Sequence, residues 1–298
     1  MMKDTDKTIE LVAGGSCGVG MSTYMDWDRQ VLETLGDYAD YISLHRYVGN
    51  RDDDTADYLA LSNAIDRQIE EMDAVCRFVQ AKRRSKKRAY LCFDEWNVWY
   101  KNMQMDGAGQ FAPHLIEEIY NLEDALVVAG FLHSFVRHAD VLKIANLAQI
   151  VNVIAPLLTR ADDLLIQSIF YPFAMMSTRR TGISLRPAVT GPGYEGKTNG
   201  YVPYLDASAI LDRDRLHVFL TNRNLTDPAE VHITLAGHTF TTCESAEILT
   251  GPDSKAANTF ETPNVVVSRP FDAVEEGEQA HCTLPPLSFA ALTLKLVP

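Results

Sequence analysis

The stretch Tyr-Leu-Cys-Phe-Asp-Glu-Trp-Asn-Val-Trp-Tyr at residues 90–100 is an apolar run that ends in two acids and three aromatic side chains. Parallel strands that are buried on both faces have continuous apolar sequences, and ligand sites collect at the carboxyl ends of such strands. We therefore predict a buried strand over 90–95 that carries Asp94 and Glu95 to a site. Aromatic faces pack on sugar rings while a carboxylate attacks the anomeric carbon, so the pattern favours sugar chemistry. An ion-paired acid beside packed aromatics is the alternative interpretation.

The segments on either side of this stretch alternate between strand and helix patterns. We expect a parallel sheet, since no hairpin signals separate the strands, and its four strands could be half of an eight-stranded (β/α)8 TIM barrel. The expected strands are 9–16, 40–47, 90–95 and 141–149, and the expected helices are 21–40, 55–81, 115–138 and a closing helix over 162–180. A loop with Met103, Met105, Gly107 and Gly109 is expected after the third strand.

After about residue 180 the pattern changes to short apolar runs between Pro and Gly turns. This pattern is typical of an all-β domain, most simply an antiparallel β-sandwich. The predicted fold class is thus α/β plus all-β. The expected domains are a partial catalytic barrel at 1–180 and a C-terminal β-sandwich at 181–298.

Composition and charge limit the possible partners. The net charge is −13 and the pI is about 5.0, which argues against a general affinity for nucleic acid or anionic membranes. One basic run, 82–88, follows a helical pattern, and we interpret it as a solvated helix end. The five cysteines are odd in number and scattered, which indicates reduced thiols and no structural zinc. The start has no apolar signal core and no run is long enough to span a bilayer, so we expect a cytoplasmic protein.

The stretch at 94–100 closely resembles the nucleophile motif of family 51 glycoside hydrolases, the α-L-arabinofuranosidases. Further similar segments follow in the family's order: Ile-Ser-Leu-His-Arg-Tyr at 42–47, Ala-Asn-Leu-Ala-Gln at 145–149, Asn-Val-Ile-Ala-Pro at 152–156 and Leu-Pro-Pro-Leu-Ser-Phe at 284–289. The resemblance implies that the strands are the second half of the barrel, equivalent to its strands five to eight, and that a β-sandwich follows.

The resemblance also assigns site residues. Glu95 matches the catalytic nucleophile, and Tyr47 matches a tyrosine that lies beside it. His45 matches a histidine of the sugar site, Trp99 an aromatic that shapes the cleft, and Gln149 a glutamine that hydrogen-bonds the sugar. A satisfied core histidine, plain aromatic packing and an amide that satisfies loop backbone are the alternatives for His45, Trp99 and Gln149.

Other polar residues receive structural interpretations. Asp94 should point to the opposite side of the strand from Glu95 and act as a structural partner. His133 and His138 are five residues apart, one step off the spacing of a zincin-type pair, so together with His114 they form no metal signature. The family reaction needs no cofactor, and the implied partner is an arabinofuranosyl-containing oligosaccharide.

A retaining glycosidase needs a second carboxylate as acid and base, about 5 to 5.5 Å from the nucleophile. In the family this is a Glu in an Asn-Glu pair on the fourth barrel strand, and 1–8 contain no such pair. We therefore expect this chain alone to be a poor or inactive glycosidase. Open sheet edges also predict a homo-oligomer or a complementing N-terminal half. Two alternatives remain: a catalytically silent sugar-binding or scaffold remnant, and a related retaining barrel glycosidase acting on xylosides or glucans.

Overall fold

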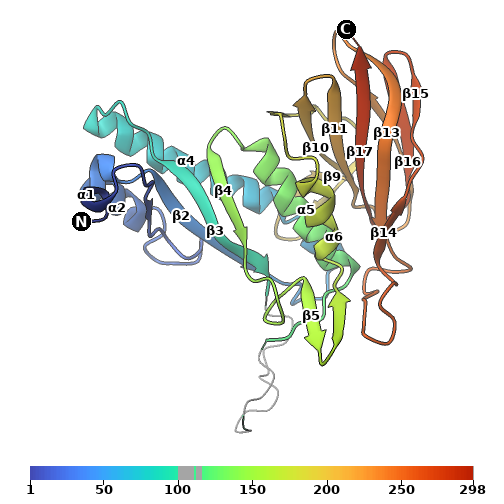
Figure 1. The fold of residues 1–298 in the computed structure, drawn as a ribbon, viewed down its shortest axis with the longest axis horizontal. Helices are drawn as coiled ribbons and strands as arrows, with labels where there is room; N and C mark the ends of the chain where they lie inside the picture. Colours follow the sequence, from blue (N-terminus) through green and yellow to red (C-terminus); the bar gives the residue numbers. More distant parts are fainter. Residues whose placement is uncertain (100–110, 112–115, 298) are drawn as a thin grey trace. The chain divides into compact units, whose positions relative to one another are not determined.

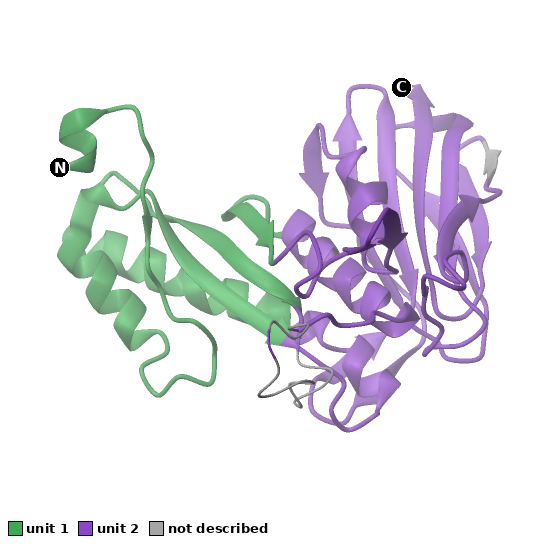
Figure 2. Cartoon of the chain, turned by 60° about the horizontal axis from the view of Figure 1, so that its bottom comes forward, with its two compact units in different colours: residues 1–47, 65–97, 138–148 green, residues 48–64, 98–137, 149–298 purple. Residues whose placement is uncertain are grey.

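The computed structural model describes residues 1–99, 111 and 116–297 (Figure 1). The chain forms two compact units, which Figure 2 shows in different colours. Unit 1 comprises 1–47, 65–97 and 138–148, and unit 2 comprises 48–64, 98–137 and 149–298. The expected domain boundary after 180 stays a prediction.

Unit 1 is built around a parallel sheet with strand order β1-β2-β3-β4. Its strands are β1 (Val12–Ala13), β2 (Tyr41–Val48), β3 (Tyr90–Val98) and β4 (Leu142–Leu147). β1 pairs with β2, and β3 with β4, in parallel. The helices that precede or connect the strands are α1 (Met2–Thr5), α2 (Asp26–Leu35), the 3-10 turn η1 (Gly36–Tyr38) and α4 (Ser62–Arg83). The predicted parallel α/β alternation is confirmed; its place as half of a barrel stays a prediction.

The core of unit 1 follows from two sequence patterns. Leu91, Cys92 and Phe93 are consecutive and all buried, as expected for a strand that is covered on both faces. On α4 the predicted apolar stripe is confirmed, since Ile65, Ile69, Met72, Cys76 and Val79 are each at most 4% exposed.

The helix predicted over 55–81 is interrupted. It consists of α3 (Thr55–Leu59) and α4, separated by a turn at 60–61. Side chains next to the turn bond to later segments of unit 2: Ser62 Oγ accepts from Arg223 Nη1 at 2.7 Å, and Asn63 Nδ2 donates to the Tyr201 carbonyl at 2.8 Å. These tertiary bonds fix the turn, and helical periodicity could not reveal them.

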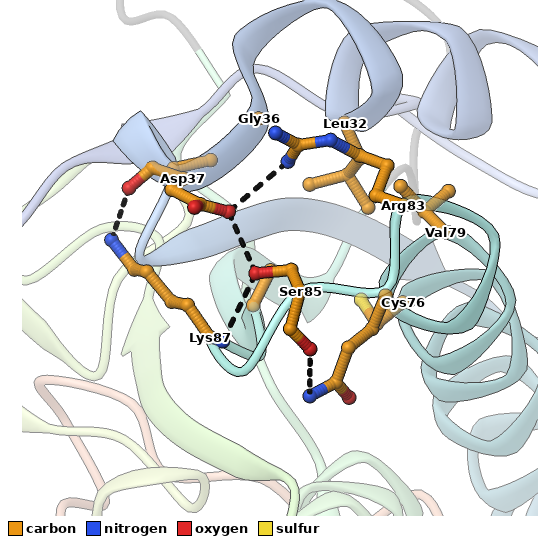
Figure 3. Close-up of a pocket in the computed structure, with 11 residues that line it drawn as sticks. Leu32, Gly36, Asp37, Cys76, Val79, Arg83, Ser85 and Lys87 are labelled. Atoms are coloured by element: carbon orange, nitrogen blue, oxygen red, sulfur yellow. Dashed lines mark hydrogen bonds and ion pairs between the residues drawn. The ribbon is translucent and has the colours of Figure 1, made fainter.

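The basic run at 82–88 begins at the end of α4, as expected, and its side chains form ion pairs with nearby carboxylates. Asp37 accepts from Arg83 Nη1 at 3.2 Å and from Ser85 Oγ at 2.8 Å (Figure 3). Gly36 lies beside this cluster with a φ of 61°, and a Cβ there would stand within 2.4 Å of the Arg83 guanidinium, so the turn requires glycine. Lys82 pairs with Glu33 in the same way at 2.8 Å. The run therefore supports the helix-end interpretation.

Unit 2 contains two antiparallel sheets over one apolar core. The larger has the order β14-β13-β17-β11-β10-β7 and the smaller the order β12-β16-β15. Their strands are β7 (Ile183–Leu185), β10 (Leu205–Asp212), β11 (Arg215–Asn222), β12 (Ala229–Thr234), β13 (Thr239–Thr250), β14 (Val267–Pro270), β15 (Val274–Glu276), β16 (Gln279–Leu284) and β17 (Ser288–Val297). Buried residues of both sheets, such as Val218, Leu292, Val231 and Ala280, form the common core. The predicted antiparallel β pattern is confirmed.

Helix α5 (Leu122–Arg137) covers the other face of the larger sheet (Figure 1). The buried ring of His133 bonds to Ser208 Oγ on β10 at 2.8 Å and to Thr221 Oγ1 on β11 at 2.9 Å. Ser208 and Thr221 are next to Ala207 and Leu220 along their strands, and Ala207 and Leu220 point the other way, into the core between the sheets. His133, which we expected to be an ordinary helix-surface or packing residue, is thus a packing residue. The helix begins later than the predicted residue 115, because 116–121 are not helical.

The closing helix predicted over 162–180 is too long. Residues 157–166 form a hairpin of β5 (Leu157–Arg160) and β6 (Asp163–Ile166), and α6 spans only Phe170–Ser177. Ala161 forms the tight turn with a φ of 48°, and the Asn152 side chain binds the Thr159 amide at 2.8 Å. The apolar spacing of 165–176 imitates a helix across this boundary. A second hairpin pairs β8 (Gly193–Gly196) with β9 (Gly200–Pro203).

A buried charge network ties α5 to the larger sheet and yields a stability prediction. Asp206, 7% exposed, lies 2.7 Å from Arg137 Nη1 and 3.5 Å from Arg223 Nη2. Burial alone would raise the pKa of Asp206, but the two guanidinium charges hold it well below its usual value. We expect Asp206→Asn to lower the free energy of unfolding by about 3 kcal/mol at pH 7, because two buried cations lose their partner. Urea denaturation measures the change.

The matched control is Glu261→Gln, which breaks an exposed pair with Arg160 and should cost much less, because water screens exposed pairs. Because the pKa of Asp206 is depressed in the folded state, its stabilisation is present above the unfolded value and is lost as the pH falls through the folded value. The difference between wild type and Asp206→Asn should therefore shrink below about pH 4. An equal cost for both substitutions would contradict the prediction.

Candidate active site

Strands β2 and β3 bring three of the predicted site residues together within unit 1. Backbone bonds from Tyr90 N to Asp40 O and from Trp99 N to Val48 O show that the two strands run in parallel. Near their carboxyl ends the Tyr47 hydroxyl donates to Glu95 Oε2 at 3.0 Å, and His45 Nδ1 lies 3.5 Å from the same oxygen. The geometry is that of a carboxylate held by two neighbours; the catalytic roles stay predictions.

Asp94 joins this cluster, against the expectation that it points away from it. Its Oδ1 lies 3.1 Å from His45 Nε2, so the imidazole meets both acids. The reason is an irregularity in the sheet: Phe93 pairs with Ala145 and Trp96 with Leu147, so two residues of β3 oppose one residue of β4. Such a bulge breaks the strict alternation of side chains. The structural partner of Asp94 is thus His45.

The two acids lie in different environments. The Glu95 side chain is 49% exposed, whereas that of Asp94 is 32% exposed. Partial burial raises the pKa of Asp94, and the Glu95 charge raises it further, while His45 acts in the opposite direction. The cluster therefore consists of one imidazole that lies close to two carboxyl groups in different environments.

Backbone and side-chain bonds hold the strand ends in place. Gln68 of α4 donates from Nε2 to the His45 carbonyl at 3.1 Å and accepts from Arg46 Nη1 at 3.1 Å. On β3 the fully buried Asn97 donates from Nδ2 to the Ala148 carbonyl at 2.6 Å. The roles of Gln68 and Asn97 could not be predicted from the sequence, since single buried amides leave no periodic signal.

The remaining predicted residues belong to unit 2 or to undescribed segments. Trp99 is half-buried. Gln149 is exposed, and its backbone N–H donates to the Ile154 carbonyl at 3.4 Å. Their roles at a sugar site stay predictions. His114 and the predicted loop with Met103, Met105, Gly107 and Gly109 lie outside the described residues.

The described residues were also compared with the requirements of a membrane-spanning helix and of a metal site. No helix among them is long and apolar enough to cross a membrane. They contain no group of three or more His, Cys, Asp or Glu side chains placed to hold a metal ion. His138, for which we expected the same kind of role as for His133, lies 3.3 Å from Asp66.

The site is a carboxylate held at the carboxyl end of a parallel strand, in a chain that continues into two antiparallel sheets, and similarity to known proteins places the chain among the glycoside hydrolases. The protein-family model of the α-L-arabinofuranosidase C-terminal domain matches residues 94–288 of this chain. The chain is 42% identical, over 99% of its length, to the intracellular exo-α-(1→5)-L-arabinofuranosidase 1 of Bacillus subtilis. The chain therefore belongs to the α-L-arabinofuranosidase family, glycoside hydrolase family 51.

Solved structures agree with this membership. The family 51 α-L-arabinofuranosidase AbfB of Bifidobacterium longum aligns over 98% of this chain with a TM-score of 0.92 and 29% identity. The arabinose complex of the Thermotoga maritima α-L-arabinofuranosidase aligns over 99% with a TM-score of 0.81 and 26% identity. The chain spans 60% of the Bacillus subtilis relative, 60% of AbfB and 59% of the Thermotoga maritima chain.

The contacts of His45 predict how the pKa of Asp94 responds to its neighbours. Glu95→Gln removes a charge that raises this pKa, so the pKa should fall; His45→Gln removes a charge that lowers it, so the pKa should rise. Carbon-13 NMR titration of aspartate-labelled protein measures both shifts. The exposed Asp162 serves as an internal control that should not move, and shifts of the same sign in both variants would contradict the cluster.

Proposed function

We propose that this chain supplies the nucleophile side of a retaining α-L-arabinofuranosidase. The observation that carries the proposal is the Glu95 carboxylate held by Tyr47 at 3.0 Å and His45 at 3.5 Å at the carboxyl end of β3. The substrates are terminal non-reducing α-L-arabinofuranosyl residues of arabinan, arabinoxylan and arabino-oligosaccharides. The family membership supports the substrate class, and the contacts of Tyr47 and His45 with Glu95 support its role in the reaction.

In the first step a Glu95 oxygen attacks the anomeric carbon, the bond to the leaving oxygen breaks, and a covalent glycosyl-enzyme forms. The Tyr47 hydroxyl orients the attacking carboxylate through its hydrogen bond to Glu95 Oε2. In the second step water attacks the same carbon, the bond to Glu95 breaks, and the water proton passes to the carboxylate that served as the acid, so the sugar leaves with retained configuration. No cofactor takes part.

The acid that protonates the leaving oxygen lies outside this chain in the proposal. Asp94 does not fill this role, since its carboxyl group is engaged with His45. The isolated chain should therefore turn over natural substrates poorly, and a complementing N-terminal segment would complete the site. A homo-oligomer would cover the open sheet edges but would not supply the missing acid. Trp99 and Gln149 are proposed to contact the sugar.

The names of the relatives support the substrate class. The relatives from Bacillus subtilis and Halalkalibacterium halodurans are intracellular exo-α-(1→5)-L-arabinofuranosidases, and one from Bifidobacterium longum is an exo-α-(1→6)-L-arabinofuranosidase. We infer an exo mode of attack and a cytoplasmic location from these names. Both linkages are represented, so the proposal is limited to the terminal sugar.

The decisive experiment is intact-mass analysis of the purified chain after exposure to an arabinofuranosyl donor with an activated leaving group, which needs no acid. We expect a mass increase of one pentosyl group, because Glu95 can attack unaided. Glu95→Gln should show no adduct, and Glu33→Gln on α2 should show the wild-type adduct. No adduct from folded wild type would favour a silent sugar-binding remnant, and preference for a xylosyl or glucosyl donor would favour another glycosidase specificity.

Tyr47→Phe tests the role of the phenol. The variant removes the hydrogen bond to Glu95 while retaining the ring, and hydrogen bonds to charged groups contribute about 1.5–3 kcal/mol. Adduct formation should slow by about tenfold or more. Tyr41→Phe, at the opposite end of β2, removes a hydroxyl that binds Glu10 instead and should leave the rate unchanged. Equal rates in Tyr47→Phe and wild type would exclude the proposed role.

A further inference from the structure

The smaller sheet of unit 2 places two histidines directly opposite each other. β12 and β16 pair in antiparallel fashion, and in their register His232 faces His281. The two residues are 49 positions apart in sequence, so only the strand pairing brings them together.

The alternation of the two strands sends both histidines outward. On β12 Val231 is buried in the core between the sheets, and on β16 Ala280 and Cys282 are buried there too. Because side chains alternate along a strand, the histidines between these residues lie on the opposite face. His232 is exposed and His281 is half-buried, so solvent reaches the pair.

The ring geometry is suited to a shared ligand. The two imidazole centroids are 6.1 Å apart and their planes make an angle of 32°. A metal ion bound to an imidazole nitrogen at about 2.1 Å lies about 3.2 Å from the ring centroid. Two such rings on one ion stand up to about 6.4 Å apart when the two nitrogens lie on opposite sides of the ion, and they stand closer when the angle at the ion is smaller. The observed separation lies near this upper limit, so binding requires a rotation of the exposed His232 ring toward His281.

We propose that His232 and His281 form a binding site for a divalent late transition metal ion such as Zn²⁺, Ni²⁺ or Cu²⁺. Imidazole nitrogen is a favoured ligand for these ions. The described residues contain no cluster of three metal-binding side chains, so the site has two protein ligands and water completes the coordination. Glu230 shares the outward face of β12 and adds negative charge on that side.

The position of the site indicates what bound metal would do. β12 is the end strand of the order β12-β16-β15, and end strands present unpaired backbone groups. An ion that bridges His232 and His281 would join this strand to its neighbour. Binding to the folded chain but not to the unfolded chain stabilises the folded state. The site therefore acts as a metal-dependent clamp on the smaller sheet.

The test is isothermal titration of the full, tag-free chain with Ni²⁺, after treatment with a chelator and its removal. We expect one Ni²⁺ per chain, with binding reversed by chelator. His232→Ala and His281→Ala should each weaken binding by about a hundredfold or more, because the second ligand of a chelate acts at high effective concentration. The control variants are His238→Ala, a histidine of the β12–β13 turn, and Cys17→Ser, an exposed thiol; both should bind as wild type does.

Thermal unfolding provides an independent reading. Ni²⁺ should raise the midpoint of wild type and of His238→Ala, and leave the midpoint of the two single variants unchanged. Wild-type binding that is unaffected by His232→Ala and His281→Ala would overturn the proposal, as would an equal loss in His238→Ala. Absence of Ni²⁺ binding to folded wild type would overturn it as well.

Discussion

The pairing of β2 with β3 is the interaction on which the candidate site depends. Two strands from different parts of the sequence run in parallel, and their carboxyl ends place a hydroxyl, an imidazole and two carboxyl groups together. The bulge at 94–95 is equally necessary, since it lets one imidazole contact two consecutive acids. A regular strand would have given Asp94 and Glu95 opposite directions.

Much of this arrangement could be predicted from the residues themselves. The apolar run before Asp94 identified a strand covered on both faces, and the stripe on α4 identified its helix. Glu95 and Tyr47 were assigned through a resemblance of motifs, and they are hydrogen-bonded in the structure. The strand and helix predictions share a cause: a buried strand and an amphipathic helix each impose a period that the sequence must carry. The roles of Glu95 and Tyr47 rest on the resemblance and stay predictions.

The failures have a physical cause too. The break at 60–61 depends on bonds that Ser62 and Asn63 make with residues more than 130 positions later. The hairpin at 157–166 depends on a left-handed backbone at position 161. Alanine stands there, where a glycine or asparagine would have signalled the turn. The contact between Asp94 and His45 depends on a bulge. In each case tertiary contacts override the local pattern, and a reading based on periodicity cannot detect them.

Asp94 and Glu95 have different surroundings, and the difference matters for the proposed reaction. Glu95 is about half exposed, and Tyr47 donates a hydrogen bond to its carboxylate. Asp94 is less exposed and is shared with His45, and its pKa is raised. A nucleophile must be ionised and free to approach carbon, whereas a partner that orients an imidazole must stay where it is. In the proposed reaction this difference favours Glu95 for attack and Asp94 for support, and it assigns the acid to another carboxyl group.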